Sequence, residues 1–460
     1  MKRLTTLAIL AAVLMALAAS VSAEQARKLP ESAYIKSARI EMSNAEAKRD
    51  TTFYISAQAM LDSLFLYYGP NPEALWLQSR IMIDYLSYIP GLKAKAPYVT
   101  KYAMYVDSLK WACGSKTVPD KSKKECKDFV ANADSLRVKN WREFFNAGIA
   151  QLNSLDEFNK QLTGSDSLVV ASAKEGIAAN SDSALVNFQY CVTLDPSEPK
   201  SFVAIGTLYE KQRNYDSANA WLIRALKTSA DSAKPQIITS IAYNYIGAND
   251  YCGAIPYFND YLKFQPKDTS NMYNLSICYS RCKMYDSAVD VYRRMLAIAP
   301  GNFDALEGIG RFFNTMALAA NDSSRHYSDA KDDAGAKKWA DLRTQRFDSS
   351  YTYFKAAYTA DPKEESAADE YAVVASILEK FDEAVAVYTA LTQAQPNNSN
   401  YWSSLGDCYY SKKDWDKAAT AYEKVAELTP ENRPNLERLR DVYELGKKPE
   451  KQAEIEKKLK

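Results

Sequence analysis

The amino-acid sequence predicts an all-α protein built as an array of helical hairpins. Proline recurs at 34-residue intervals, from Pro266 to Pro300 and again from Pro362 through Pro396 to Pro430. Between these prolines the same residue types recur at the same offsets, with apolar residues spaced three and four apart. That spacing places them on one face of a helix. A period sustained over several copies is the signature of a repeat architecture.

The N-terminal residues 1–23 have the pattern of a secretory signal peptide. Lys2 and Arg3 precede an apolar run from Leu7 to Ala19, and small residues follow up to Ala23. A run of this length is too short to span a hydrocarbon core, which takes about 20 apolar residues. We therefore expect an exported chain that is not membrane-spanning, located in the periplasm, associated with the outer membrane, or secreted.

Residues 24–164 are helical by pattern, but their repeat register is poor. An apolar stretch from Tyr54 to Tyr68 ends at Gly69 and Pro70, and another from Ala74 to Ile89 ends at Pro90 and Gly91. Glycine and proline at these points mark helix ends. The region is expected to be an α-helical N-terminal region, with degenerate repeats as one interpretation.

Residues 165–432 carry the regular repeats. The clearest copy is the last, which contains Trp402, Leu405, Gly406, Tyr409, Trp415, Ala418, Tyr422, Val425 and Pro430. This pattern resembles the tetratricopeptide repeat (TPR). The small residues Gly406 and Ala418 allow two helices to approach closely, and proline ends the second helix. Turns between paired helices are expected near Asn214, Asp250, Lys283, Lys380 and Asp414.

Two repeats are enlarged. A first helix containing Leu306 and Phe313 finds its partner only at Phe347, so residues 318–346 are an insertion, read either as lengthened helices joined by a loop or as a projecting hairpin. Upstream, a helix containing Phe188 pairs either with Leu168–Ala179 or with Phe144–Gln151. Residues 433–460 form a C-terminal capping repeat, because their outer side is charged.

The resemblance implies a right-handed superhelical solenoid whose first helices line a concave, partner-binding groove. Positions two, five, nine and twelve of the repeats supply the candidate contacts Lys200, Thr207, Tyr243, Tyr273, Glu307, Arg311, Asn314, Asp369, Asp407 and Tyr410. The partner would be a protein or peptide segment. The resulting hypothesis is a non-catalytic interaction scaffold of the bacterial cell envelope.

An alternative hypothesis assigns binding to the N-terminal aromatic residues. Aromatic faces stack on sugar rings, so Tyr85, Tyr88, Tyr98, Tyr102 and Tyr105 suggest a glycan- or peptidoglycan-binding envelope protein. The tyrosines of the regular repeats, by contrast, occupy positions expected to be in the core.

Composition argues against several classes of function. With 58 basic and 57 acidic residues, the chain has no excess positive charge with which to hold nucleic acid. His326 is the only histidine, which excludes sites needing two imidazoles. The sequence contains no catalytic motif, so we expect neither an enzyme nor a cofactor or metal.

The seven cysteines offer two candidate disulfides. Cys113 and Cys126 flank a polar loop, and Cys252 can reach Cys282 from the start of the preceding helix. Disulfides persist in oxidising compartments, so this interpretation depends on export.

Overall fold

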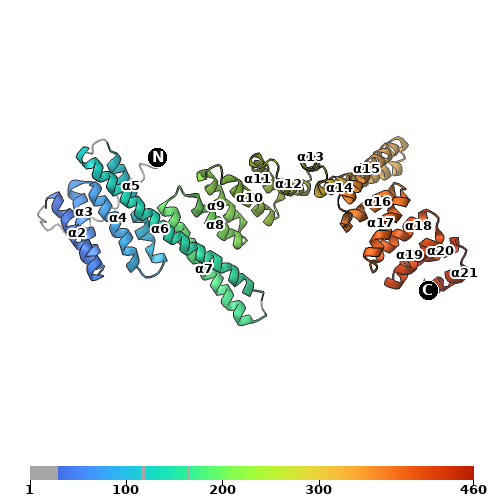
Figure 1. Ribbon diagram of the computed structural model, residues 1–460, viewed down its shortest axis with the longest axis horizontal. Helices are drawn as coiled ribbons and strands as arrows, with labels where there is room; N and C mark the ends of the chain where they lie inside the picture. Colours follow the sequence, from blue (N-terminus) through green and yellow to red (C-terminus); the bar gives the residue numbers. More distant parts are fainter. Residues whose placement is uncertain (1–28, 116–119, 164, 460) are drawn as a thin grey trace. The chain divides into compact units, whose positions relative to one another are not determined.

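The computed structural model describes residues 29–115, 120–163 and 165–459, and these are all-α, as predicted. The predicted signal peptide, residues 1–23, lies outside the described residues. Twenty α-helices and two short 3-10 helices form the described part, which contains no strand (Figure 1). The chain divides into two compact units, with unit 1 ending at Gly247 and unit 2 beginning at Ala248.

The helices of unit 1 are α2 (Glu31–Lys48), α3 (Thr52–Tyr68), α4 (Pro72–Tyr85), η1 (Leu86–Tyr88), η2 (Lys93–Lys95), α5 (Ala96–Gly114), α6 (Asp120–Gln161), α7 (Ser167–Leu194), α8 (Pro199–Lys211), α9 (Tyr215–Thr228) and α10 (Lys234–Gly247).

The helices of unit 2 are α11 (Tyr251–Phe264), α12 (Thr269–Arg281), α13 (Tyr285–Ile298), α14 (Phe303–Asp329), α15 (Asp333–Ala360), α16 (Glu365–Ile377), α17 (Phe381–Ala394), α18 (Ser399–Ser411), α19 (Trp415–Leu428), α20 (Arg433–Leu445) and α21 (Pro449–Leu459).

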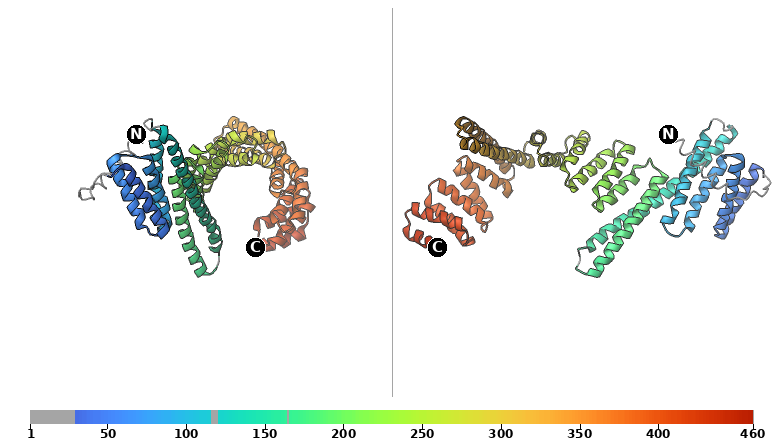
Figure 2. Two further views of the ribbon diagram at one scale, coloured as in Figure 1. Left: turned by 60° about the vertical axis from the view of Figure 1, so that its left-hand side comes forward. Right: turned by 180° about the vertical axis from the view of Figure 1, so that it is seen from behind.

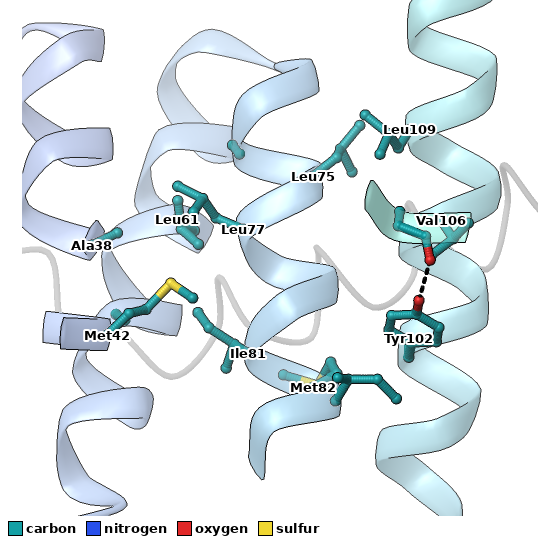
Figure 3. Packing of buried hydrophobic residues seen from close by; sticks show 14 of the residues in the cluster. Ala38, Met42, Leu61, Leu75, Leu77, Ile81, Met82, Tyr102, Val106 and Leu109 are labelled. Atoms are coloured by element: carbon teal, nitrogen blue, oxygen red, sulfur yellow. Dashed lines mark hydrogen bonds between the residues drawn. The ribbon is translucent and has the colours of Figure 1, made fainter. Parts of the chain in front are cut away.

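The N-terminal part of unit 1 is a bundle with its own core. Helices α2 to α5 bury side chains such as Met42, Leu61 and Leu77 against one another (Figure 3). The hydroxyl of Tyr102 on α5 donates a hydrogen bond of 2.6 Å to the carbonyl oxygen of Ala133 on α6. The Tyr102 side chain is fully buried, so this bond gives its hydroxyl group the partner that water cannot provide. The bundle and α6 therefore share one core.

Helices α6 and α7 form one long hairpin (Figure 2). A Cβ placed on Gly148 would lie 2.5 Å from the ring of Phe188, so only glycine allows this approach. Nearby, the amide of Asn187 donates to Oε1 of Gln151 over 3.0 Å. The first-helix partner of Phe188 is thus the 144–151 segment, while 168–179 belongs to the same helix as Phe188. The boundary expected at residue 164 falls between the two helices of this hairpin.

The regular hairpins cross at the predicted small residues. A Cβ on Gly406 of α18 would lie 2.6 Å from the ring of Tyr422 on α19, and one on Gly206 of α8 would lie 2.8 Å from Leu222 on α9. Ala418, the other predicted crossing residue, is fully buried. The residues that define the sequence repeat are therefore those that set the distance between paired helices.

The turns of these hairpins share one geometry. The residue two positions before the second helix adopts a left-handed backbone conformation, with φ of 57° at Arg213 and 60° at both Lys283 and Lys413. In several of these turns a side-chain cap follows, as where Asn214 accepts a hydrogen bond from the amide of Ser217. Such caps satisfy amides that have no partner inside the helix. These turns lie where the sequence predicts them.

The predicted insertion lengthens both helices of one hairpin. Helix α14 has 27 residues and α15 has 28, whereas the neighbouring α16 and α17 have 13 and 14. The added segments pair with each other and meet at a tight turn, where Lys331 has a φ of 57° and Asp332 caps α15 (Figure 2). The structure matches the first interpretation, lengthened helices joined by a loop: α14 and α15 each run on without interruption to the turn.

Candidate partner-binding face

The ten candidate groove residues fall in different units. Lys200 and Thr207 on α8 and Tyr243 on α10 belong to unit 1. The other seven belong to unit 2 and lie on its first helices: Tyr273, Glu307, Arg311, Asn314, Asp369, Asp407 and Tyr410. In unit 2, two of these residues contact the next first helix: Arg311 on α14 pairs with Glu370 on α16, and Asp407 on α18 pairs with Arg438 on α20.

Arg311 is the centre of the first contact. Its Nε lies 2.8 Å from Oε1 of Glu370 on α16, and its Nη2 lies 3.1 Å from Oε1 of Glu307 on α14 itself. Nη2 also donates to Oγ of Ser366 over 3.0 Å. Arg311 is thus held between two consecutive first helices, and it is not the freely projecting side chain that its offset suggests.

Tyr273 on α12 lies in the electrostatic environment of this cluster. Burial raises the pKa of its hydroxyl, and the carboxylates of Asp304 and Glu307 raise it further. The predicted neighbours Tyr273 and Arg311 are therefore close enough to influence each other.

Two adjacent carboxylates on α16 are poorly compensated. Burial raises the pKa of both Asp369 and Glu370, and the charge of Asp369 raises the pKa of Glu370 further. Asp369 accepts a hydrogen bond from the hydroxyl of Tyr388. Among the described residues, Oε2 of Glu370 is buried without a hydrogen-bond partner. Glu370 on α16 and Glu307 on α14 thus share one guanidinium, that of Arg311.

The next contact joins α18 to α20. Oδ1 of Asp407 accepts a hydrogen bond of 2.6 Å from the hydroxyl of Tyr422 and lies 3.3 Å from Nη1 of Arg438 on α20. The same Nη1 donates to Oγ of Ser403 over 3.2 Å. Neighbouring first helices are therefore linked through side chains on one shared face.

Exposed apolar side chains accompany these charges. Val373 and Ile377 follow Asp369 at intervals of four on α16 and are 40% and 46% exposed. At the C-terminal ends of α18 and α20, Tyr410 is 38% and Leu445 is 46% exposed. We call the first-helix face the set formed by Tyr273, Glu307, Arg311, Asp369, Glu370, Val373, Ile377, Asp407, Tyr410, Arg438 and Leu445.

Sequence reasoning missed part of this face. The position-nine offset that selects Arg311 and Asp407 also falls on Val373, so the repeat register contained that signal. Glu370 and Arg438 occupy position six, which was not among the offsets used. Their role depends on the rotation of neighbouring helices, which the sequence pattern does not specify.

The N-terminal tyrosines lie in the core of the bundle. Tyr102 is fully buried, and Tyr85, Tyr88, Tyr98 and Tyr105 pack against the same core. The rings of Tyr85 and Tyr98 contact each other at a centroid distance of 5.1 Å. These rings contribute to packing, and they do not form an open aromatic platform of the kind that stacks on sugars.

The structure joins both candidate cysteine pairs. Cys113 and Cys126 form a disulfide with a Cα–Cα distance of 5.5 Å, and Cys252 and Cys282 form one at 5.7 Å. The second connects the first turn of α11 to the end of α12. The described residues include no group of three or more His, Cys, Asp or Glu side chains arranged to hold a metal ion. No described helix is both long and apolar enough to cross a membrane.

Two segments match the tetratricopeptide repeat family, residues 272–306 and residues 378–433. With the helical hairpins, these matches define a TPR protein. Proteins of this class are typically non-catalytic and generally serve as scaffolds for protein–protein interaction. No curated protein is significantly similar to the chain.

Several solved structures are similar at low sequence identity. A tetratricopeptide repeat protein from Parabacteroides merdae is 13% identical and aligns over 65% of this chain and 98% of its own, with a TM-score of 0.34. PilF of Pseudomonas aeruginosa is 15% identical over 54% and 98%, with a TM-score of 0.35. YrrB, described as a TPR protein with an unusual peptide-binding site, is 15% identical over 46% and 95%, with a TM-score of 0.29.

Proposed function

We propose that this chain is a non-catalytic scaffold of the bacterial cell envelope that binds a protein or peptide segment on the first-helix face of unit 2. The observation that carries the proposal is the contact series on this face, in which Arg311 reaches from α14 to α16 and Arg438 from α20 to α18. These contacts hold charged side chains of successive repeats in position. A preorganised surface loses less conformational entropy when a partner binds.

The envelope location has separate support. The N-terminal 23 residues have the pattern of an export signal, and both disulfides require a compartment in which thiols oxidise. N-terminal sequencing of the chain isolated from cell fractions tests this part. A mature chain that begins at Glu24 in an envelope fraction supports it, and a chain that keeps residues 1–23 in the cytosol contradicts it.

Partner binding is tested by using the purified chain as bait in envelope extracts. Arg311→Ala and Tyr273→Ala are compared with Lys337→Ala, which changes an exposed lysine in the extended hairpin. Arginine and tyrosine are common interface anchors, and truncating an anchor costs about 2 kcal/mol or more. We expect both variants to lose a partner that Lys337→Ala retains. Equal capture by all three chains would show that the partner binds elsewhere.

A further inference from the structure

We infer that the segment bound on the first-helix face is cationic and apolar: an extended stretch in which lysine or arginine alternates with aliphatic or aromatic residues. This inference rests on the proposed function and specifies the chemistry of its partner.

The charge of the face supports a cationic partner. Glu307, Asp369, Glu370 and Asp407 give four negative charges, and Arg311 and Arg438 give two positive charges, so the net charge is −2. Both arginines are already engaged with carboxylates of the face. A partner's carboxylate would meet this negative excess, whereas an ammonium or guanidinium group would compensate it.

The carboxylates of α16 show where a positive charge would bind best. Asp369 and Glu370 are adjacent and partly desolvated, and Oε2 of Glu370 has no hydrogen-bond partner among the described residues. A positive charge on the partner, hydrogen-bonded to the exposed side of these partly exposed carboxylates, would relieve the repulsion between them. Charge-assisted hydrogen bonds of this kind are stronger than neutral ones.

Apolar side chains lie toward the other end of the same helices. Val373 and Ile377 are one and two turns beyond Asp369, and Tyr410 is one turn beyond Asp407. On α16 and α18 a carboxylate is therefore followed by exposed apolar side chains, and with Leu445 of α20 these form an apolar row toward the C-terminal ends of the helices. A purely polar cationic segment would leave the apolar row in water, so the face matches a segment with both kinds of side chain.

The spacing of the helices sets the length of the segment. Packed helices lie about 10 Å apart, and an extended chain rises about 3.3 Å per residue, so one helix corresponds to about three residues. Three helices then accommodate about nine residues. A side chain recurring every third residue would meet equivalent positions of successive repeats.

The test measures binding of labelled peptides to the full purified chain by fluorescence anisotropy. The probes contain three repeats of Lys-Val-Thr, of Glu-Val-Thr, or of Lys-Ser-Thr, each capped at both ends. We expect the Lys-Val-Thr peptide to bind at least about tenfold more tightly than the other two, because only it has both the charge and the apolar side chains. Its affinity should fall as salt is raised from about 50 to about 300 mM, since screening weakens attraction between exposed charges.

Two sets of variants locate the binding. Asp369→Asn with Asp407→Asn removes two charges from the face, and Asp329→Asn with Asp333→Asn removes two from the exposed tip of the α14–α15 hairpin. Ile377→Ser removes an exposed apolar side chain from the face, and Ile298→Ser removes one from the end of the second helix α13. Each face variant should weaken binding of the Lys-Val-Thr peptide about tenfold, and each matched control should leave it unchanged. Thermal unfolding of each variant verifies that it remains folded.

The inference is overturned if the Glu-Val-Thr peptide binds as tightly as the Lys-Val-Thr peptide, if no peptide binds, or if the face variants match their controls. None of these results contradicts the proposed function, which is tested separately by whether capture of a partner depends on Arg311 and Tyr273. Loss of that dependence would instead overturn the proposed function itself, so the two failures are distinguishable.

Discussion

The hairpins α14/α15 and α18/α19 have the same crossing but very different lengths. In both, a glycine of the first helix lies under an aromatic ring of the second: Gly310 under Phe354, and Gly406 under Tyr422. In the longer hairpin, each helix continues for 14 residues beyond the length of its regular neighbours. Fourteen residues are about four whole helical turns. The residues at the end of each extension therefore face nearly the same side of the helix as those where the extension begins.

This difference shows where a repeat array accepts an insertion. The crossing fixes the packing between hairpins, and the turn at the far end can move outward without disturbing it. Ser350, for example, still donates a hydrogen bond of 2.9 Å to the carbonyl oxygen of Gly310. Stability should therefore depend strongly on the crossing and weakly on the extension.

The largest expected effect is at the crossing of the long hairpin. Phe354 is fully buried, and Phe354→Ala should lower the free energy of unfolding by about 3 to 5 kcal/mol through lost burial and a cavity. Leu318→Ala, on the extension, should change it by less than about 0.5 kcal/mol because Leu318 is half-exposed. Urea unfolding followed by circular dichroism measures both. Similar losses would mean that the extension is part of the stabilising core.

The second effect compares the two glycines directly. A Cβ at Gly310 or Gly406 would lie 2.7 or 2.6 Å from a ring atom, so Gly310→Ala and Gly406→Ala should each destabilise the protein by about 1 to 3 kcal/mol. Thermal melts of the two variants should show comparable decreases in the unfolding midpoint. A decrease in Gly406→Ala alone would show that lengthening the helices has loosened the crossing.

A smaller effect is expected at the two turns. Asp332 caps α15 by accepting a hydrogen bond of 2.9 Å from the amide of Gly335, and Asp414 caps α19 in the same way at 3.3 Å from the amide of Lys417. Loss of a cap costs about 1 kcal/mol. Hydrogen exchange should show that Asp332→Ala increases opening only within the extension, whereas Asp414→Ala affects its whole hairpin. If the increase in hydrogen exchange extends over the whole hairpin in both variants, the extension unfolds together with the array.

The smallest effect concerns the junction between the long hairpin and the next regular one. Hydrogen bonds from Lys355 and Tyr371 lower the pKa of Glu383 from 4.5 to about 2. Because the folded-state pKa is below the unfolded value, this carboxylate stabilises the fold fully above pH 4.5. That contribution is lost as the pH falls toward 2.

The Glu383 side chain is 37% exposed, so screening by water keeps its contribution modest. Between pH 5 and about 2.5, the unfolding midpoint of the native chain should fall more steeply than that of Glu383→Gln. Parallel pH profiles would show that the ion pair between Lys355 and Glu383 adds nothing to the junction.

The sequence predicted the hairpins well because their determinants are local. Small residues such as Gly406 and Ala418 are required wherever two helices approach closely. Their recurrence along the sequence therefore marks the crossings directly. The partner of Phe188 stayed ambiguous because α6 is a 42-residue helix whose apolar residues do not mark a single repeat. The ion pair between Arg311 and Glu370 was not predictable, since it depends on how α14 and α16 are rotated against each other.

The Cys252–Cys282 disulfide sets a limit on how far the array can be stretched. Tension along a repeat array separates its hairpins, and a released segment of 30 residues could extend by up to about 100 Å. The disulfide closes that segment at its ends, so force along the chain bypasses α12 and cannot draw the segment out. With thiols oxidised, a pulled chain would therefore reach its full length about 100 Å shorter than with thiols reduced.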